Sequence, residues 1–271
     1  MTKISISIVT YNISVDDFEK VYRSLYKTST RWTLYVIDNS PKNDLYESIK
    51  DDKRVVYVHN PSNPGFGAAH NIALELATAS GAEYHFIVNP DIYFYEDVIT
   101  PMIEYMESHS DVGMLMPQIL NTDGSVQYLP KLLPSPFWIF RRKLRTKINL
   151  YGGFLSKYEL RSVSNSKIYN TPILSGCFTL LNLEAVKKVG TYDDRFFMYF
   201  EDFDLSRRIH KEYKTLYFPK VSVYHNYEGG ANKSLKLFTI FIASAVKYFN
   251  KWGWLFDKQR KSMNKKTLAQ F

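Results

Sequence analysis

Short apolar runs rich in Ile, Val and Tyr alternate with segments of helical period from Ile4 to Met116, and this alternation limits the folds open to the chain. Helices are predicted after Ser14, over Phe66–Ala79 and over Asp97–Ser108, because apolar residues recur there at helical spacing. The predicted strands are Ile4–Val9, Leu34–Ile37, Val55–Val58, Tyr84–Val88 and Val112–Met116. Strands and helices that alternate in this way form βα units. The pattern predicts an α/β fold with a mostly parallel sheet flanked by helices.

The second half of the chain is less regular. Residues 129–167 are rich in Pro, basic and aromatic residues and show no clear period, so we expect an insertion that faces a second substrate. Order returns with predicted strands at Ile173–Leu181, Leu216–Phe218 and Ser222–His225 and predicted helices at Leu183–Val189 and Phe203–Tyr213. We expect one domain over residues 1–230 and a helical, aromatic and basic extension over 231–271.

Composition excludes some classes of protein. Of the 271 residues 45% are hydrophobic, which is enough for a packed core and excludes general disorder. Cys177 is the only cysteine and cannot form an internal disulfide, which fits a reducing compartment. The first residues lack the pattern of a signal peptide, and no apolar run reaches the roughly 18–20 residues that span a bilayer. We therefore expect a cytoplasmic protein.

The net charge of +8 is concentrated in two clusters. They consist of Arg141, Arg142, Lys143, Arg145 and Lys147, and of Lys258, Arg260, Lys261, Lys265 and Lys266. No nucleic-acid-binding module accompanies them, so anionic lipid or a phosphorylated substrate is the expected partner. The aromatic segments Pro136–Arg142 and Leu237–Ile242, with Trp252 and Trp254, fit peripheral contact with the inner face of the cytoplasmic membrane. Packing onto the domain or in a homodimer is an equal alternative.

Polar residues gather at the ends of four predicted strands: Thr10-Tyr11-Asn12, Asp38-Asn39, Asn60 to Asn71, and Asn89-Pro90-Asp91. Ligands of open α/β sheets bind at the carboxyl ends of the strands. The distribution therefore predicts a ligand site at this edge of the sheet.

Three features of that edge have two readings each. The loop from Asn63 to Asn71 contains Gly65 and Gly67 and could hold a diphosphate or a sugar, or could be an ordinary helix-starting loop. Asp91 could bind a divalent cation or cap a proline turn. His225 could be a metal ligand or a structural residue at a strand end.

The segment Glu201-Asp202-Phe203-Asp204 carries three carboxylates directly after the aromatic run Phe196–Phe200. Carboxylates crowded beside apolar walls have raised pKa values, which suits a general base. The same carboxylates could cap the helix that follows, and both roles are compatible.

Taken in order, these motifs resemble glycosyltransferase family 2, whose members have the GT-A fold, a Rossmann-like nucleotide-binding sheet. The matching segments are Ser7–Asn12, Val36–Ser40, Asn63–Gly67 with Asn71, and Asn89–Asp91. Ser175–Phe178, Val189–Asp193 and Phe197–Leu205 are similar to the rhamnosyltransferase-type branch. The resemblance extends from the N-terminus to His225.

The resemblance implies a role for each matching position. Donor or nucleotide binding is implied for Thr10, Tyr11, Asn12, Asp38, Asn39, Asn63, Gly65, Gly67, Asn71 and Asn89. Asp91 stands at the end of the family's metal-binding Asp-X-Asp motif, whose first position is Asn89 here, and His225 becomes a further ligand of Mg²⁺ or Mn²⁺. Asp202 matches the catalytic base, with Glu201 as its neighbour.

The implied activity is inverting transfer of a sugar from a nucleotide-diphosphate donor to a glycan or lipid-diphosphate-linked glycan. The branch suggests dTDP-rhamnose as donor and a bacterial surface polysaccharide such as O-antigen as product; a UDP-linked galactosyl, glucosyl or N-acetylhexosaminyl donor is the alternative. A nucleotidyltransferase would carry a basic Gly-rich loop after its first strand, which Thr10–Ile13 lacks. A non-catalytic carbohydrate-binding or scaffold protein has little use for the Glu201–Asp204 carboxylates.

Overall fold

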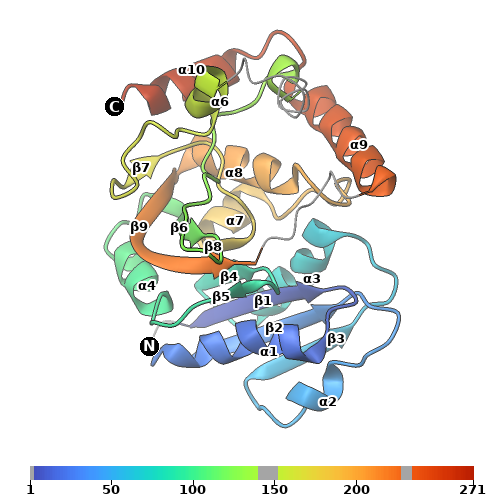
Figure 1. Cartoon of the computed structure of the whole chain (residues 1–271). Helices are drawn as coiled ribbons and strands as arrows, with labels where there is room; N and C mark the ends of the chain where they lie inside the picture. Colours follow the sequence, from blue (N-terminus) through green and yellow to red (C-terminus); the bar gives the residue numbers. More distant parts are fainter. Residues whose placement is uncertain (1–2, 140–151, 227–233) are drawn as a thin grey trace.

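The computed structural model describes residues 3–139, 152–226 and 234–271 and forms one mixed sheet covered by helices (Figure 1). The strands are β1 (Ile4–Thr10), β2 (Trp32–Asp38), β3 (Val55–His59), β4 (Tyr84–Val88), β5 (Ile92–Tyr93), β6 (Val112–Leu120), β7 (Tyr169–Asn170), β8 (Phe178–Asn182) and β9 (Lys214–His225). Their order is β3-β2-β1-β4-β8-β6-β9-β5, with β7 paired to β9.

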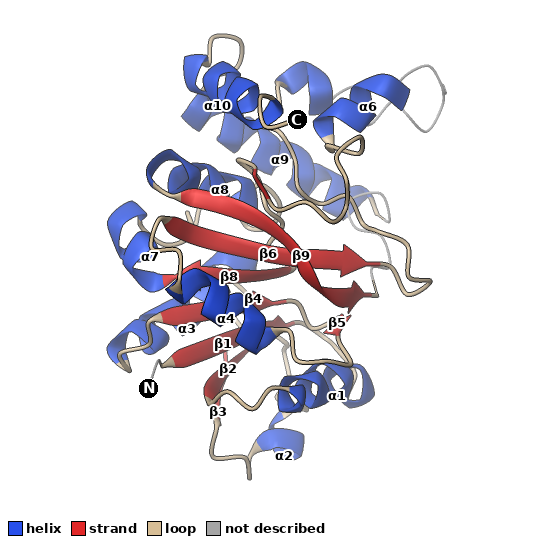
Figure 2. Ribbon diagram, turned by 90° about the vertical axis from the view of Figure 1, so that its left-hand side faces the viewer, coloured by secondary structure: helices blue, strands red, loops and turns tan. Residues whose placement is uncertain are grey.

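The helices are α1 (Val15–Ser24), a 3₁₀ turn η1 (Leu25–Lys27), α2 (Tyr46–Ile49), α3 (Phe66–Ala79), α4 (Ile99–Glu107), α6 (Gly152–Tyr158), α7 (Leu183–Val189), α8 (Glu201–Glu212), α9 (Leu235–Trp252) and α10 (Lys258–Leu268). In Figure 2 the strands are stacked in sheet order, and α6, α9 and α10 gather beyond β9. The C-terminal helices therefore lie at the β9 end of the sheet, away from the half that is built from β1 to β4.

The half of the sheet built from β1 to β4 is parallel, as the sequence predicts. β1 lies between β2 and β4, and β3 is the outer neighbour of β2. β8 then enters antiparallel between β4 and β6, and β6 pairs in parallel with β9. The carboxyl ends of β1, β2 and β4 therefore meet at one edge, which positions the candidate site.

β1 is buried on both faces although every second residue before Val9 is a serine. Ser7 Oγ lies 2.7 Å from His70 Nδ1 and 2.7 Å from His85 Nε2, and Ser5 Oγ lies 2.7 Å from His85 Nδ1. The hydroxyls are thus paired with two buried imidazoles between β1, β4 and α3, which satisfies polar groups that burial would otherwise penalise.

Several elements differ from the sequence prediction. β9 is one strand, where two were predicted, because residues between Phe218 and Ser222 stay extended through a register shift against β6. α8 begins at Glu201 rather than Phe203, and β8 begins at Phe178 rather than Ile173. Within residues 129–167, Pro136–Ile139 and α6 are helical. The basic cluster at residues 141–147 lies outside the described residues.

α9 packs against the aromatic segment that precedes α8. A second core cluster unites Phe196 and Phe200 with Ala245, Tyr248 and Phe249 of α9. The hydroxyl of Ser244 also donates to the carbonyl of Met198 at 2.8 Å. The C-terminal segment is therefore packed onto the rest of the chain through the residues next to Glu201 and Asp202. In the described part of the chain, no helix combines the length and apolarity needed to cross a membrane.

Candidate active site

Asp38, at the end of β2, is held by three neighbouring groups. Its Oδ1 accepts from Thr10 Oγ1 and from the Ser40 backbone N–H, both at 3.0 Å, and its Oδ2 accepts from the Tyr57 hydroxyl at 2.7 Å. The side chain is buried, yet it lines a cavity of about 170 Å³ that Asn12 also lines. A carboxylate has about four acceptor positions, so Oδ2 retains capacity for a ligand N–H.

Of the Thr10-Tyr11-Asn12 turn, Asn12 lines this cavity. Asn12 has a left-handed backbone (φ 51°), and its N–H donates to Ser40 Oγ at 2.8 Å. Tyr11 is exposed and is absent from the lining of both described cavities. Asn39 is buried, and its Oδ1 accepts from Asn60 Nδ2 at 2.9 Å, which ties the ends of β2 and β3.

The glycine loop before α3 packs against a distant segment. Gly65 has φ 104°, and a Cβ on it would lie 2.1 Å from the carbonyl oxygen of Phe197. That carbonyl accepts from the Phe66 N–H at 2.8 Å. A Cβ on Gly67 would lie 3.0 Å from the Cβ of Tyr192. Both glycines are thus required for close packing of the 192–197 segment, a role that the sequence did not reveal.

Asn71 completes this packing. Its Nδ2 donates to the carbonyl of Tyr192, and its Oδ1 accepts from the Tyr192 N–H, both at 2.9 Å. The amide of Asn71 therefore holds the 192–197 segment. Asn63, also with a left-handed backbone (φ 44°), donates its N–H to the Asn60 carbonyl.

The two predicted metal ligands meet. β5 pairs antiparallel with β9 so that Ile92 lies opposite His225, and Asp91 Oδ1 comes within 3.3 Å of His225 Nε2. Two cis ligands, each roughly 2.1 Å from one ion, are separated by about 3 Å. The pair therefore fits a divalent cation.

Gln127 fixes the imidazole of His225. Gln127 Nε2 donates to the His225 carbonyl at 3.1 Å, and Gln127 Oε1 accepts from His225 Nδ1 at 3.0 Å. With its hydrogen on Nδ1, a neutral ring turns its Nε2 lone pair toward Asp91, the arrangement of metal-binding histidines. Asn89 Oδ1, also buried, accepts no hydrogen bond from the described residues. No group of three or more His, Cys, Asp or Glu side chains with metal-binding geometry occurs in residues 3–139, 152–226 and 234–271.

Asp202 and Glu201 open helix α8. The two residues before them, Tyr199 and Phe200, have left-handed backbones (φ 69° and 67°), which is costly for aromatic residues and is typical of functional sites. Asp202 Oδ1 accepts from the Phe203 N–H at 2.9 Å, and its Oδ2 accepts from the Gly176 N–H at 3.4 Å.

The two carboxyls differ in protonation. Burial raises the pKa of Glu201 well above its usual range, and the nearby Asp202 carboxylate adds to the effect. Burial raises the pKa of Asp202 as well, but the N–H groups of Gly176 and Phe203 and the Lys131 ammonium oppose it. Glu201 Oε2 has no hydrogen-bond partner among the described residues. We therefore assign the proton to Glu201 and the charge to Asp202.

The Ser175–Cys177 loop contacts both Asp202 and the segment that leads to Asp91. The Cys177 carbonyl accepts from the Asn89 N–H at 2.8 Å, while the N–H of Gly176 faces Asp202. Burial raises the pKa of the Cys177 thiol to about 12, and the carboxylates of Asp91 and Asp202 act on it in the same direction. Asp91 and Asp202 therefore both lie near this loop.

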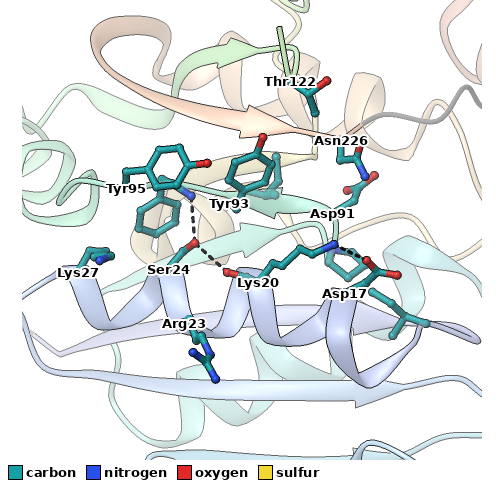
Figure 3. Close-up of a pocket in the computed structure, with 14 residues that line it drawn as sticks. Asp17, Lys20, Arg23, Ser24, Lys27, Asp91, Tyr93, Tyr95, Thr122 and Asn226 are labelled. Atoms are coloured by element: carbon teal, nitrogen blue, oxygen red, sulfur yellow. Dashed lines mark hydrogen bonds and ion pairs between the residues drawn. The ribbon is translucent and has the colours of Figure 1, made fainter. Parts of the chain in front are cut away.

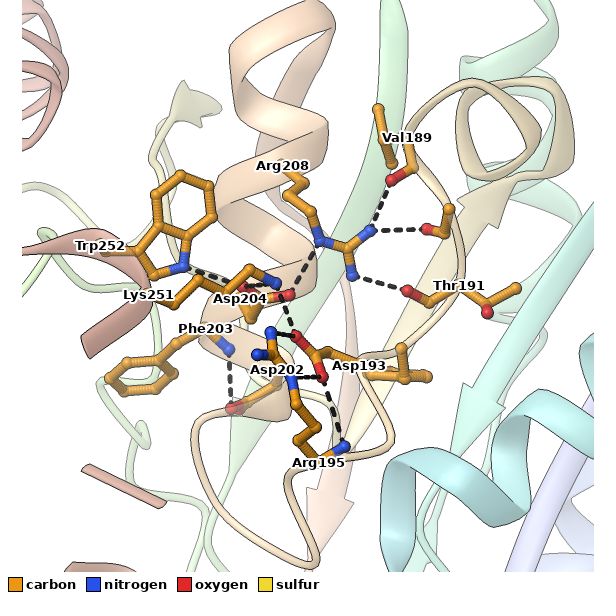
Figure 4. A network of polar contacts seen from close by, with 12 residues as sticks. Val189, Thr191, Asp193, Arg195, Asp202, Phe203, Asp204, Arg208, Lys251 and Trp252 are labelled. Carbon is orange, nitrogen blue, oxygen red and sulfur yellow. Dashed lines mark hydrogen bonds and ion pairs between the residues drawn. The ribbon is translucent and has the colours of Figure 1, made fainter. Parts of the chain in front are cut away.

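Asp204 belongs to a structural network instead (Figure 4). It accepts from Arg208 Nε and from Trp252 Nε1, both at 2.8 Å, and pairs with Lys251 at 2.7 Å. Arg208 in turn donates to the carbonyls of Val189, Gly190 and Thr191. The third carboxylate of the acidic run thus joins α8 to α9 and to the end of α7.

A larger cavity of about 780 Å³ lies beside Asp91, between α1 and the Pro90–Tyr95 segment (Figure 3). Lys20 and Ser24 line it from α1, Lys27 lines it from η1, and Tyr93 and Tyr95 line it from the opposite side. Ile13 borders both this cavity and the smaller one at Asp38. The two cavities are therefore neighbours that meet at the end of β1.

Four functional candidates carry no motif of their own in the sequence: Tyr57, Gln127, Lys131 and Tyr192. Each acts on a predicted residue from a distant part of the chain. The polar residues at strand ends indicated Asp91 as a candidate metal ligand, but no local pattern identifies Gln127, which contacts the imidazole of His225.

Comparison with known proteins agrees with this geometry. The family model for Glycosyl transferase family 2 matches residues 5–190. The N-acetylglucosaminyl-diphospho-decaprenol L-rhamnosyltransferase of Mycobacterium tuberculosis is 27% identical over 179 residues, which cover 61% of this chain and 56% of that protein. The low-salt glycan biosynthesis hexosyltransferase of Haloferax volcanii is 22% identical over 211 residues, covering 77% of this chain and 62% of that protein.

Solved structures with the same fold include GalNAc-T7 with UDP, GalNAc and Mn²⁺ (TM-score 0.62, 16% identity, 84% of this chain and 44% of that chain). TarS of S. aureus superposes over 99% of this chain and 43% of its own, with TM-score 0.60 and 15% identity. The chain belongs to glycosyltransferase family 2, and the α/β GT-A fold predicted from its sequence is confirmed. It spans 56% to 62% of the length of these two curated relatives.

Proposed function

We propose that the protein is an inverting hexosyltransferase that moves a sugar from a nucleotide-diphosphate donor to a glycan acceptor. One juxtaposition supports the proposal: the Asp91–His225 pair and the carboxylate of Asp202 both lie near the Ser175–Cys177 loop. A cation-binding pair and a general base at neighbouring positions suit a reaction in which a phosphate leaves as a hydroxyl attacks.

The donor nucleotide fits the two adjoining cavities. Its base would occupy the smaller cavity, where Asp38 Oδ2 accepts a ring N–H and Asn12 lies on the wall. Its diphosphate would pass Ile13 toward Asp91. Because Tyr11 is exposed next to Asn12, it would cover the nucleotide from the solvent side.

Asp91 and His225 would hold a divalent cation, Mg²⁺ or Mn²⁺, with Asn89 as a neighbouring oxygen donor. When bound, such a cation supplies positive charge beside the phosphate oxygens on which negative charge develops. Carboxylate and imidazole are both ligands of Mn²⁺, and two protein ligands leave positions for phosphate and water.

Asp202 would remove the proton from the acceptor hydroxyl. The new bond joins that oxygen to the anomeric carbon, the bond from that carbon to the phosphate oxygen breaks, and the nucleoside diphosphate leaves from the opposite face. Because Glu201 keeps its proton, Asp202 is the charged member of the pair and is oriented by the N–H of Gly176. Gly65, Gly67, Asn63 and Asn71 would act indirectly, by fixing the segment that leads to Asp202.

The names of the relatives motivate the finer assignments. We propose dTDP-rhamnose as the donor and a lipid-diphosphate-linked glycan as the acceptor, since the name of the Mycobacterium tuberculosis relative includes L-rhamnosyl transfer and a diphospho-decaprenol group. A UDP-sugar is the alternative, because TarS and GalNAc-T7 have both been crystallised with UDP.

A thermal-shift screen of UDP, dTDP, GDP, CDP and ADP, each with Mn²⁺ or EDTA, tests the proposal. A ligand that binds only the folded state raises its stability, by about 2.7 kcal/mol at a hundredfold excess over Kd. We expect dTDP to raise the melting temperature in Mn²⁺ and to have a smaller effect in EDTA. A shift with UDP alone selects the alternative donor.

Asp91→Ala provides the matched control, because it removes the cation ligand outside the Asp38 cavity. The variant should lose the Mn²⁺-dependent part of the shift and keep the rest. If no nucleotide shifts the wild-type protein and no donor sugar is hydrolysed on prolonged incubation, the transferase proposal is wrong.

A further inference from the structure

The turn between α9 and α10 exposes three consecutive large apolar residues. Trp254 is 44% exposed, Leu255 73% and Phe256 93%. In Figure 1 this turn lies at the opposite end of the molecule from α2 and β3. Contiguous exposed apolar side chains on a soluble surface mark an interaction site.

The turn is held in place from both sides. Gly253 ends α9 with φ 96°, and Trp254 Nε1 donates to Asn250 Oδ1 at 2.8 Å. Asp257 caps α10 by accepting from the Arg260 N–H and forms a buried ion pair with Arg207 at 2.8 Å. Because Asp257 is anchored in the interior, the exposure of Leu255 and Phe256 is a property of the fold and not of a frayed end.

Positive charge surrounds the turn. Residues 235–271 contain eight Lys or Arg and one acidic residue, Asp257, so they carry +7 of the chain's net charge of +8. Lys258, Lys261, Lys265 and Lys266 are exposed on α10, and within the described ranges none of them forms an ion pair. Exposed apolar tips next to unpaired lysines are the chemistry of a segment that binds an anionic lipid surface.

We propose that the α9–α10 turn is a docking surface for an anionic membrane, with Leu255 and Phe256 entering the headgroup boundary and the lysines of α10 facing the acidic headgroups. A second copy of the chain is a poorer occupant. A twofold interface places the same patch of both copies face to face, which would bring two strongly positive segments together.

The inference goes beyond the proposed transfer reaction and does not depend on it. The proposed docking surface and the proposed active site are both next to helix α9, because Ser244 and Tyr248 of α9 also contact the segment before Glu201. A protein docked in this way would meet a lipid-linked acceptor at the surface on which it rests.

Co-sedimentation of the full chain with vesicles tests the docking surface without any need for activity. We expect the wild-type protein to bind phosphatidylcholine vesicles that contain phosphatidylglycerol, and to bind pure phosphatidylcholine much less. Leu255→Ser/Phe256→Ser should weaken binding about tenfold or more, because both side chains lose their buried area. Lys258→Glu/Lys261→Glu should weaken it to a similar degree and should make the remaining binding less sensitive to salt.

Matched variants use exposed residues elsewhere on the surface. Tyr46→Ser/Val56→Ser changes two exposed apolar residues on α2 and β3, and Lys53→Glu/Lys220→Glu makes the same change in net charge away from α10. Both should bind vesicles nearly as the wild type does. Equal losses in test and control pairs, or no binding of the wild type to anionic vesicles, overturn the proposal. So does a wild-type dimer in lipid-free buffer that Leu255→Ser/Phe256→Ser dissociates, since the surface would then join two copies.

Discussion

Glu201, Asp202 and Asp204 lie within four consecutive positions but have three different environments. Glu201 is buried without a partner for Oε2, Asp202 accepts two backbone N–H groups, and Asp204 is neutralised by Arg208 and Lys251. Because α8 begins at Glu201, successive side chains point in different directions around its first turn. The first turn of α8 therefore places the three carboxylates of this acidic segment in different surroundings.

Asp202→Asn should reduce kcat by about 10²–10⁴-fold, because general-base catalysis contributes that much, and should leave donor affinity nearly unchanged. In the wild type, kcat/KM should rise with pH through the pKa of Asp202, which burial raises above its usual range. The measurement is kcat/KM against pH together with nucleotide Kd. Near-normal turnover of Asp202→Asn would remove this residue as the base.

Glu201→Gln should stabilise the fold at neutral pH. Since the pKa of Glu201 is raised in the folded state, its stability contribution is complete below the unfolded pKa and declines as pH rises. Because Gln is uncharged, like protonated Glu201, the variant should not lose this stability as pH rises. Urea unfolding at pH 5 and pH 8 should show a larger gain at the higher pH, and an equal loss at both would contradict the assignment of the proton to Glu201.

Gln127→Leu should weaken Mn²⁺ binding by about 10–100-fold, the usual effect of losing a residue that orients a metal-binding histidine. Gln118→Leu is the control, because Gln118 also bonds to β9, through Ser222 and Tyr217, but lies away from Asp91. Isothermal titration of Mn²⁺ in the presence of the nucleotide separates the two. If both variants bind Mn²⁺ equally well, Gln127 has no role in the cation site.

At the scale of elements, the glycine loop packs the start of α3 against the 192–197 segment, which leads to the proposed catalytic base Asp202. Gly65→Ala combines an unfavourable φ of 104° with a Cβ placed 2.1 Å from the Phe197 carbonyl oxygen. Gly124→Ala has a similar φ of 82° but meets no atom within 4 Å. The strained backbone alone costs about 1–2 kcal/mol, so Gly65→Ala should lose clearly more stability than Gly124→Ala. Chemical denaturation of both variants measures the difference, and equal losses would mean that the Phe197 contact contributes nothing.

The sequence predicts the elements whose signals are local and misses those that depend on distant contacts. Polar residues at predicted strand ends indicated Asp38 and Asp91 as site candidates, and the family resemblance added His225 as a candidate metal ligand. The two-residue strand β5 has no period to detect, yet it brings Asp91 to His225. Gln127 and His225 are 98 residues apart, and Asn71 and Tyr192 are 121 apart, so no local pattern reveals either contact. Gly65 was recognised as unusual, but its partner Phe197 was not.

At the scale of the whole molecule, the C-terminal helices pack against the rest of the chain and form a second hydrophobic cluster with it. The aromatic rings of α9 cover Phe196 and Phe200, and the Arg207–Asp257 pair joins α8 to α10 in the interior. Composition identified this segment as helical, aromatic and basic, but composition alone cannot separate the rings that pack from those that remain exposed. Helices α9 and α10 therefore pack against the segment next to the proposed active site, and the turn between them exposes Leu255 and Phe256.

Acid stability of the whole fold should be controlled in part by two buried histidines. Burial lowers the pKa of His85 to about 3 and that of His70 well below its usual value. Unfolded histidine titrates near pH 6.5, so below that pH the unfolded chain binds more protons and stability falls as pH falls toward the folded pKa. Each histidine should cost about 2 kcal/mol between pH 7 and pH 5. His85→Gln should make the urea-unfolding free energy less sensitive to pH across this range, and His109→Gln, which changes an exposed residue after α4, is the control variant. A pH dependence that His85→Gln does not reduce would mean that the buried Ser5–His85–Ser7–His70 chain does not limit stability in acid.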